Sequence, residues 1–381
     1  MKLTAFVAPL VLLAAACSPP AEVSEGVTTA PMSQEARMTM ERVNASRFTN
    51  PMSPTLQEED PRAAVPNAPP AGPAGATPTE ATPTTTEAYD AGLVRIQVLL
   101  DRAHFSPGVI DGYDGENVRK AVSAYQAANG LAVNGLADEA LLTRLEQGDS
   151  APALVAYVLT EEDVRGPFVD VPQDLLAMSE LEHVGYESAA EAVAEKFHMD
   201  EDLLRTLNPG VDFGSAGAEI VVANAGGDLS ADVASIEIDT REEAVRAFDE
   251  AGTLIAYYPA TVGTTEAPTP TGEHTVRAIA FDPTYRYDPA RLPTFGNRGH
   301  GAVNIAGGPN NPVGAVWIAL SADTYGIHGA PQPQLVSKAG SHGCVRLTNW
   351  DAVELGRASR AGVPVRFTSG TGLAQRPQRA G

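Results

Sequence analysis

Residues 325–347 read YGIHGAPQPQLVSKAGSHGCVRL, and they bring four chemically versatile side chains into one short stretch: His328, His342, Cys344 and Arg346. A cysteine attacks carbonyl groups as its thiolate, so a nucleophilic cysteine needs a base or a positive charge beside it. Imidazole is the side chain whose ordinary pKa suits it best to that task near neutral pH. The stretch therefore predicts a thiol nucleophile, Cys344, with His328 as its proton acceptor and donor.

The neighbouring residues offer groups for substrate binding and for charge stabilisation. Gly343 allows backbone N–H groups to approach an oxyanion closely, and the backbone of His342 lies beside it. Arg346 presents a forked cation that fits a substrate carboxylate or, alternatively, a carboxylate of the same domain. Ser341 and Tyr325 are candidates for substrate contacts. Their alternative roles are structural hydrogen bonding for Ser341 and core packing for Tyr325.

A zinc site is an alternative use of the same side chains, because imidazole and thiolate are both good zinc ligands. His328, His342 and Cys344 would need a further ligand, and His274 or His300 would have to converge on them. A catalytic pair explains the stretch without that convergence. We therefore expect neither a metal nor another cofactor.

The sequence around this stretch predicts a mainly-β domain. From residue 234 onward, apolar residues recur with a period of two, which is typical of half-buried strands. The clearest alternating or apolar segments are 235–239, 244–248, 254–262 and 316–320. A single helix is expected over 349–358. Together these patterns indicate one compact β domain.

The signature resembles that of the L,D-transpeptidase catalytic domain of the YkuD type. In that family His-Gly is followed by a loop and then by Ser/Thr-His-Gly-Cys-Val/Ile-Arg-Leu/Met. Residues 328–329 and 341–347 match this signature residue by residue, and Pro-Thr-Gly at 270–272 matches an upstream family segment. The similarity spans residues 234–368, and it implies a β-sandwich-like fold with acyltransferase activity on peptidoglycan.

The resemblance implies a role for each matched residue. Cys344 would attack the carbonyl of the third residue of a stem peptide, normally meso-diaminopimelate, and expel D-Ala. His328, oriented by the backbone carbonyl of Gly329, would take the thiol proton and later protonate the leaving amine. Backbone N–H groups around His342, Gly343 and Cys344 would stabilise the oxyanion. An amine of a second stem peptide would then resolve the thioester and form a 3–3 cross-link, whereas water would give L,D-carboxypeptidase activity.

A small helical module precedes the β domain. Residues 88–147 contain three helical patterns separated by turns, the first of which is Pro-Gly-Val-Ile-Asp-Gly at 107–112. The second helix ends in Gly-Leu at 130–131. This pattern resembles the three-helix peptidoglycan-binding domain, with a helical spacer as the alternative interpretation.

A second module is expected between the helical module and the β domain. Residues 179–225 resemble a LysM module, a βααβ fold that binds glycan strands. Helices are expected over 189–197 and 201–207, followed by Asn-Pro-Gly and a strand at 219–223. The first strand of the module is expected around 181–184.

The N-terminal residues have the composition of an export signal. Residues 1–16 combine Lys2, a short apolar run and three alanines, which is typical of a cleaved signal peptide. Cys17 follows directly, as in the lipobox of bacterial lipoproteins, although Leu13 lies one position further upstream than the usual leucine. We expect lipidation of Cys17, with ordinary cleavage that leaves a free thiol as the alternative.

Two further segments read as spacers. Residues 17–87 end in a segment rich in Pro, Ala and Thr. They carry too little apolar surface to offset the entropy of ordering, so they predict a disordered linker. Residues 369–381 predict a flexible tail.

The composition restricts the function classes. A net charge of −22 argues against nucleic-acid binding, and two cysteines rule out a disulfide framework. We expect an exported protein of the periplasm or cell envelope, attached to a membrane by a lipid anchor, with peptidoglycan stem peptides and glycan strands as partners. Two other functions stay open. One is a cysteine L,D-carboxypeptidase or a hydrolase that releases wall-attached protein, and the other is a wall-binding lipoprotein without activity.

Overall fold

The computed structural model describes residues 30–47, 89–264, 268–288, 301–338 and 343–370. The expected signal peptide, Cys17 and most of the expected C-terminal tail lie outside these residues. Within the described ranges, no helix is both long and apolar enough to cross a membrane.

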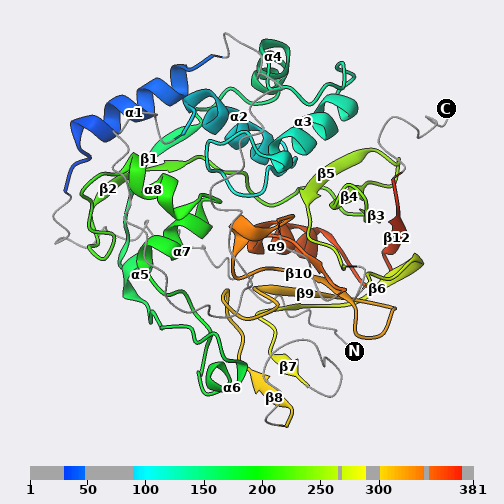
Figure 1. The fold of residues 1–381 in the computed structure, drawn as a ribbon. Coiled ribbons are helices and arrows are strands. Elements are labelled where there is room, and N and C mark those ends of the chain that lie inside the picture. Colours follow the sequence, from blue (N-terminus) through cyan, green and yellow to red (C-terminus); the bar gives the residue numbers. More distant parts are fainter. Residues whose placement is uncertain (1–29, 48–88, 265–267, 289–300, 339–342, 371–381) are drawn as a thin grey trace, which may run out of the picture.

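The C-terminal domain is built on one mixed eight-stranded sheet (Figure 1). The strand order is β11-β10-β9-β6-β12-β3-β4-β5. The bounds are β3 Ser235–Asp239, β4 Ala244–Phe248, β5 Leu254–Pro259, β6 Gly272–Phe281, β9 Val316–Leu320, β10 Gly326–His328, β11 Val345–Arg346 and β12 Pro364–Thr368. Strand β6 pairs with β12 and with β9, and its register shifts between Val276 and Ala278. The long strand β6 therefore connects the two halves of the sheet.

Both halves of the sheet share one apolar core with helix α9, Asn349–Ala358. The core contains Ile236 and Val245 from one half, Ile318 and Ile327 from the other, and Leu355 from α9. Burial of these side chains is the main force that holds the helix on the sheet. The prediction of a mainly-β domain is confirmed, and the expected helix has the predicted bounds.

The N-terminal helical region is also present. It consists of α2 Ala91–Arg102, α3 Glu116–Ala128 and α4 Glu139–Gly148. Two buried glutamines fix the turns between these helices. Oε1 of Gln97 accepts the N–H of Gly112 at 2.7 Å, and Oε1 of Gln126 accepts the N–H of Gly135 at 3.0 Å. Both glycines have positive φ, so each turn combines a glycine conformation with a glutamine acceptor.

The unit between these two domains differs from the expected one in its first strand. Strand β2, Glu219–Ala223, pairs antiparallel with β1, Leu154–Val158. Between them lie α5 Glu161–Arg165, α6 Leu175–Met178, α7 Ala189–Lys196 and α8 Glu201–Leu207. The predicted strand around 181–184 is wrong: the N–H of Val184 donates to the carbonyl of Gly307 at 2.8 Å, which ties this segment to the β domain. Strands β1 and β2 thus enclose four helices, and β1 comes before the expected start at residue 179. Residues 154–223 are called the βααβ unit below, after the two paired strands and the helices α7 and α8.

The expected disordered linker contains a helix, α1, Gln34–Ala45. Ser33 caps it, and Ala36 and Val43 are buried in the core that also contains Leu204 of α8. Asn44 exchanges two side-chain hydrogen bonds with the backbone of Leu154, at 2.8 and 2.9 Å. The prediction of disorder over 17–87 is therefore wrong for this segment. One helical face is recognisable in the spacing of Met32, Ala36, Met40 and Val43. The Pro-rich composition of the rest of the expected linker obscured it.

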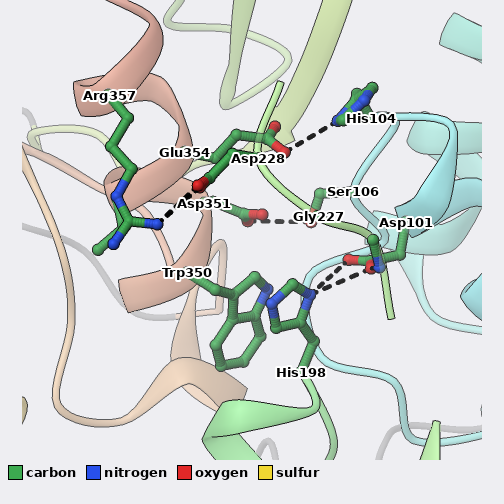
Figure 2. A pocket seen from close by; sticks show the side chains of 12 residues that line it. Asp101, His104, Ser106, His198, Gly227, Asp228, Trp350, Asp351, Glu354 and Arg357 are labelled. Atoms are coloured by element: carbon green, nitrogen blue, oxygen red, sulfur yellow. Dashed lines mark hydrogen bonds and ion pairs between the residues drawn. The ribbon is translucent and has the colours of Figure 1, made fainter. Parts of the chain in front are cut away.

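Helix α9 also carries polar contacts to the helical module (Figure 2). The hydroxyl of Ser106 donates to Oδ2 of Asp351 at 2.9 Å. Nδ1 of His104 lies 2.9 Å from Oε2 of Glu354. A cavity of about 260 Å³ lies at this junction, and neither Cys344 nor His328 lines it. The docking of the N-terminal modules therefore depends on titratable side chains.

A second ion pair lies in the same junction. Nδ1 of His198, between α7 and α8, lies 3.0 Å from Oδ1 of Asp101 of α2. The His198 ring stacks on Trp350 of α9 with 5.1 Å between the ring centroids and 7° between the ring planes, and Figure 2 shows the two rings next to each other. His198 therefore connects the βααβ unit, the helical module and the β domain.

The charges of this junction are set by burial and by the partner of each group. Burial opposes the charged form of His198 and His104, but Asp101 and Glu354 raise the pKa of each above 6.5. Burial alone would raise the pKa of Asp101, yet His198 holds it below its usual range. Burial and the charge of Asp101 raise the pKa of Asp351 well above its usual range, which favours the neutral carboxyl.

We expect the unfolding temperature of the chain to fall between pH 6 and pH 9. The two histidines bind protons more tightly in the folded chain, so their contribution is complete below about pH 6.5 and is lost as the pH rises through their raised pKa values. Asp351 acts in the same direction, because unfolding releases its buried carboxyl to ionise. Differential scanning calorimetry of the wild type and of a variant with His104→Gln and His198→Gln measures the effect. An equal pH dependence in both proteins contradicts the prediction.

Candidate active site

The predicted catalytic residues lie on or directly beside two neighbouring parallel strands, β10 and β11. In the pairing of β10 with β11, Ile327 is opposite Val345 and His328 is opposite Arg346. Ile327 and Val345 point into the core. Because side chains alternate across a sheet, His328 and Arg346 lie on the other face. Cys344 directly precedes β11, in the bend that begins with Gly343. The pairing of the strands therefore places Arg346 beside His328, and the charge of Arg346 acts on both the imidazole and the Cys344 thiol.

His328 is held in one orientation by its surroundings. Its side chain is 4% exposed, and Nδ1 lies 2.7 Å from the carbonyl oxygen of Gly329. Trp317, its register partner on β9, stacks on the imidazole with 5.5 Å between the centroids. Burial and the charge of Arg346 lower the pKa of His328 to about 3. The imidazole is therefore neutral, and because Nδ1 donates to a carbonyl, Nε2 carries the free lone pair.

Cys344 is half-buried, and its thiol contacts the turn that precedes β10. Sγ donates to the carbonyl of Thr324, 3.8 Å away. Thr324 has a φ of 73°, which is uncommon for a residue other than glycine. Burial raises the pKa of the thiol, while the backbone at Gly326 and the charge of Arg346 oppose that rise. Cys344 is therefore a protonated thiol at neutral pH, and it needs a base to become a nucleophile.

Arg346 has the position and the charge to bind an anion beside the thiol. Its main chain exchanges two 2.9 Å hydrogen bonds with Thr261. Among the residues that the structure describes, no carboxylate lies within ion-pair distance of its guanidinium. The second sequence interpretation, pairing with a carboxylate of the same domain, therefore finds no support in the described part of the chain.

Tyr285 belongs to the same site, although no sequence motif marks it. It lies on β7, Tyr285–Tyr287, which forms a separate two-stranded sheet with β8, Val303–Ile305. Burial and the nearby Cys344 raise the pKa of Tyr285 to about 12, and Arg346 partly offsets this rise. The phenol is therefore a neutral donor at physiological pH. It reaches the site through a contact distant in sequence, which local patterns do not reveal.

The remaining candidates have less direct connections to the thiol. Gly343 has a φ of 105°, a conformation that favours glycine next to Cys344. Tyr325 is half-buried, and its hydroxyl donates to the carbonyl of Pro268 at 3.4 Å, which is a structural contact. Ser341 and His342 lie outside the described residues.

The zinc alternative can be examined for part of its ligands. Among the described residues, no group of three His, Cys, Asp or Glu side chains could hold a metal ion. His274 lies on β6, where Nε2 is 3.1 Å from the carbonyl of Thr271 and the ring packs edge-on against Phe367. His300 and His342 lie outside the described part of the chain.

Two segments of the chain match known protein families. Residues 234–366 match the YkuD family, described as "L,D-transpeptidase catalytic domain". Residues 90–145 match the family described as "Putative peptidoglycan binding domain". The βααβ unit lies between these two matched segments.

Bacterial relatives give the same assignment. "Putative L,D-transpeptidase YkuD" of Bacillus licheniformis is 30% identical over 182 residues, which cover 47% of this chain and 92% of the relative. "Putative L,D-transpeptidase YqjB" of Bacillus subtilis is 35% identical over 117 residues, which cover 29% of this chain and 58% of the relative.

Solved structures with similar segments include L,D-transpeptidase 3 from Mycobacterium tuberculosis, with a TM-score of 0.30 and 17% identity. The match covers 41% of this chain and 66% of that chain. For an L,D-transpeptidase from Enterococcus faecium the TM-score is 0.27 with 21% identity, covering 39% and 56% of the two chains. This chain thus spans about two thirds or less of the length of these two solved chains.

The sheet and the family matches define a protein with an L,D-transpeptidase catalytic domain and a peptidoglycan-binding domain. The chain belongs to the L,D-transpeptidase family of the YkuD type.

We expect Arg346→Gln to shift the pH dependence of Cys344 reactivity to higher pH. The Arg346 charge lowers the pKa of both the thiol and His328, so its removal raises both pKa values. The rate of Cys344 alkylation by iodoacetamide, followed by peptide mass spectrometry from pH 4 to pH 10, measures the shift. Arg277→Gln is the matched control, because Arg277 is an exposed arginine on β6. Superimposable profiles for Arg346→Gln and the wild type would refute this account of the charge.

Proposed function

We propose that this chain is a peptidoglycan L,D-transpeptidase that forms a thioester on Cys344. The observation that carries the proposal is a neutral, buried imidazole, fixed by the Gly329 carbonyl, beside Arg346, whose charge also acts on the protonated thiol of Cys344. A neutral imidazole with a free Nε2 is a proton acceptor, and a protonated thiol needs one.

Acylation proceeds in two steps. Sγ of Cys344 attacks the carbonyl of the third residue of a stem tetrapeptide while its proton passes to Nε2 of His328. Backbone N–H groups at Gly343 and Cys344 stabilise the oxyanion, with the backbone of His342 as a further candidate. The tetrahedral intermediate then collapses, the bond to D-Ala breaks, and the His328 imidazolium protonates the leaving amine.

Transfer reverses the proton movements. The side-chain amine of a second stem peptide attacks the thioester, and His328 accepts a proton from that amine. Sγ leaves and recovers a proton, which regenerates the thiol and releases a 3–3 cross-linked product. Arg346 and Tyr285 bind a carboxylate of the stem peptide, because together they offer a guanidinium and a neutral hydroxyl donor beside the thiol.

The N-terminal modules and residues 1–17 bear on where the protein works in the cell. The helical domain binds the glycan strands from which the stem peptides project. The βααβ unit, a LysM-like module that begins with β1, binds the same strands. Domains that act on peptidoglycan imply a location in the cell envelope or periplasm. We propose that residues 1–16 direct export and that a lipid on Cys17 anchors the chain to a membrane.

Purified protein incubated with a disaccharide tetrapeptide should yield free D-Ala and a 3–3 cross-linked dimer, both detected by mass spectrometry. Cys344→Ala should abolish both products, and His328→Asn should reduce their formation by about a hundredfold or more, since a general base typically contributes 10²–10⁴. Lys196→Gln, a surface change remote from the thiol, should leave the rate unchanged.

The products also separate the competing functions. Free D-Ala without dimer would replace transfer by L,D-carboxypeptidase activity. Absence of both products, together with no mass increase of Cys344 on exposure to a carbapenem, would favour a wall-binding lipoprotein without activity.

A further inference from the structure

The backbone carbonyl that orients His328 belongs to a glycine packed against an asparagine side chain. A Cβ added to Gly329 or to Gly314 would collide with Oδ1 of Asn349, the first residue of α9. The same oxygen accepts the N–H of Ala315 at 2.9 Å. Asn349 therefore fills the space between two backbone segments, and one of these segments carries the acceptor for His328 Nδ1.

The direction of the Asn349 amide is determined by its partners. Its Oδ1 faces a backbone donor, while its Nδ2 donates to Oε1 of Glu195 at 2.8 Å and to the carbonyl of Pro309 at 3.1 Å. Rotation of the amide by 180° would place an NH₂ group against the N–H of Ala315 and an oxygen against a carboxyl group. Glu195 and Ala315 thus select one orientation.

Glu195 comes from a different module. It lies on α7 in the βααβ unit, and its Oε1 also accepts the hydroxyl of Tyr186 at 3.2 Å. Burial raises the pKa of Glu195 to about 7, against the hydrogen bonds from Asn349 and Tyr186 and the charge of His198, and Glu191 adds to the rise. Burial of the Glu195 carboxyl carries a desolvation cost, and its hydrogen bonds from Asn349 and Tyr186 offset part of that cost.

We propose that Glu195 is a positioning residue for the catalytic base. Through Asn349 it fixes the Gly329 backbone, and through the Gly329 carbonyl it fixes the ring orientation of His328. The βααβ unit is thereby a structural part of the active site in addition to any glycan-binding role. This inference rests on the proposed role of His328 as the base of Cys344.

The test compares variants that differ in their ability to reach Asn349. Glu195→Gln keeps an oxygen acceptor at the same position, so it should be acylated by a carbapenem at the wild-type rate. Glu195→Leu loses the acceptor, and Glu195→Asp draws it back by one methylene. Both should slow acylation of Cys344 by about tenfold or more, since small misplacements of catalytic groups are costly. Glu195→Asp keeps the test valid if Glu195→Leu does not fold.

A second measurement separates positioning from general loss of stability. Lys196→Leu removes the neighbouring ion pair to Asp163, which lies within the βααβ unit, and it serves as the matched control. It should lower the unfolding temperature without slowing acylation. In Glu195→Asp, the pH profile of Cys344 alkylation by iodoacetamide should change, because a loosened His328 no longer presents a fixed Nε2 to the thiol.

The outcomes distinguish this inference from the proposed function. A wild-type protein that a carbapenem does not acylate would overturn the role of Cys344 itself. Normal acylation of the wild type, Glu195→Leu and Glu195→Asp would overturn the positioning role alone. Equal slowing in Glu195→Gln and Glu195→Leu would also overturn it, because the charge and not the acceptor would then matter.

Discussion

The hydrogen bond between His328 Nδ1 and the Gly329 carbonyl spans 2.7 Å in a site where the imidazole is almost completely buried. It assigns the ring tautomer, and the tautomer decides which nitrogen can accept a proton. Donor and acceptor lie on consecutive residues, at the end of a strand that is paired on both sides by β9 and β11. The chemistry of the site therefore depends on the conformation of the backbone at residues 328–329.

Burial and one cation determine the charges around that bond. Burial favours a neutral imidazole and a neutral thiol, and Arg346 lowers the pKa of both groups. A thiolate–imidazolium pair would have to form away from water and beside a guanidinium. Burial and the Arg346 charge both disfavour the imidazolium, and burial has the larger effect. The resting state is therefore uncharged at both groups. In the proposed mechanism, charge develops only when the substrate carbonyl becomes an oxyanion. Under that mechanism, the site would stabilise the charged transition state more than the neutral bound substrate.

The sequence was informative where function depends on residues adjacent in the chain. Cys344, His328 and Gly329 belong to one motif. The strands β10 and β11 within this motif pair with each other, and that pairing places Arg346 beside His328. Tyr285 could not be predicted because it reaches the site from a separate sheet, and such contacts leave no local periodicity. The first strand of the βααβ unit was misplaced for a related reason: residues 154–158 pair with a strand far along the chain. Helix α1 was missed because average composition outweighed a short apolar face.

Helix α9 links the chemistry to the modules because its residues face three parts of the chain. Leu355 anchors it in the core of the β domain, and Asn349 at its first turn packs against the active-site backbone. Asp351 and Glu354 receive hydrogen bonds or ion pairs from the helical module. Modules joined to the β domain only by flexible linkers would need none of these buried polar contacts, and each such contact carries a desolvation cost. The contacts indicate docked modules. In the proposed function, a docked module would present a bound glycan strand at a fixed place relative to Cys344. The site around Cys344 would then select the peptide while the modules would supply the affinity for the polymer.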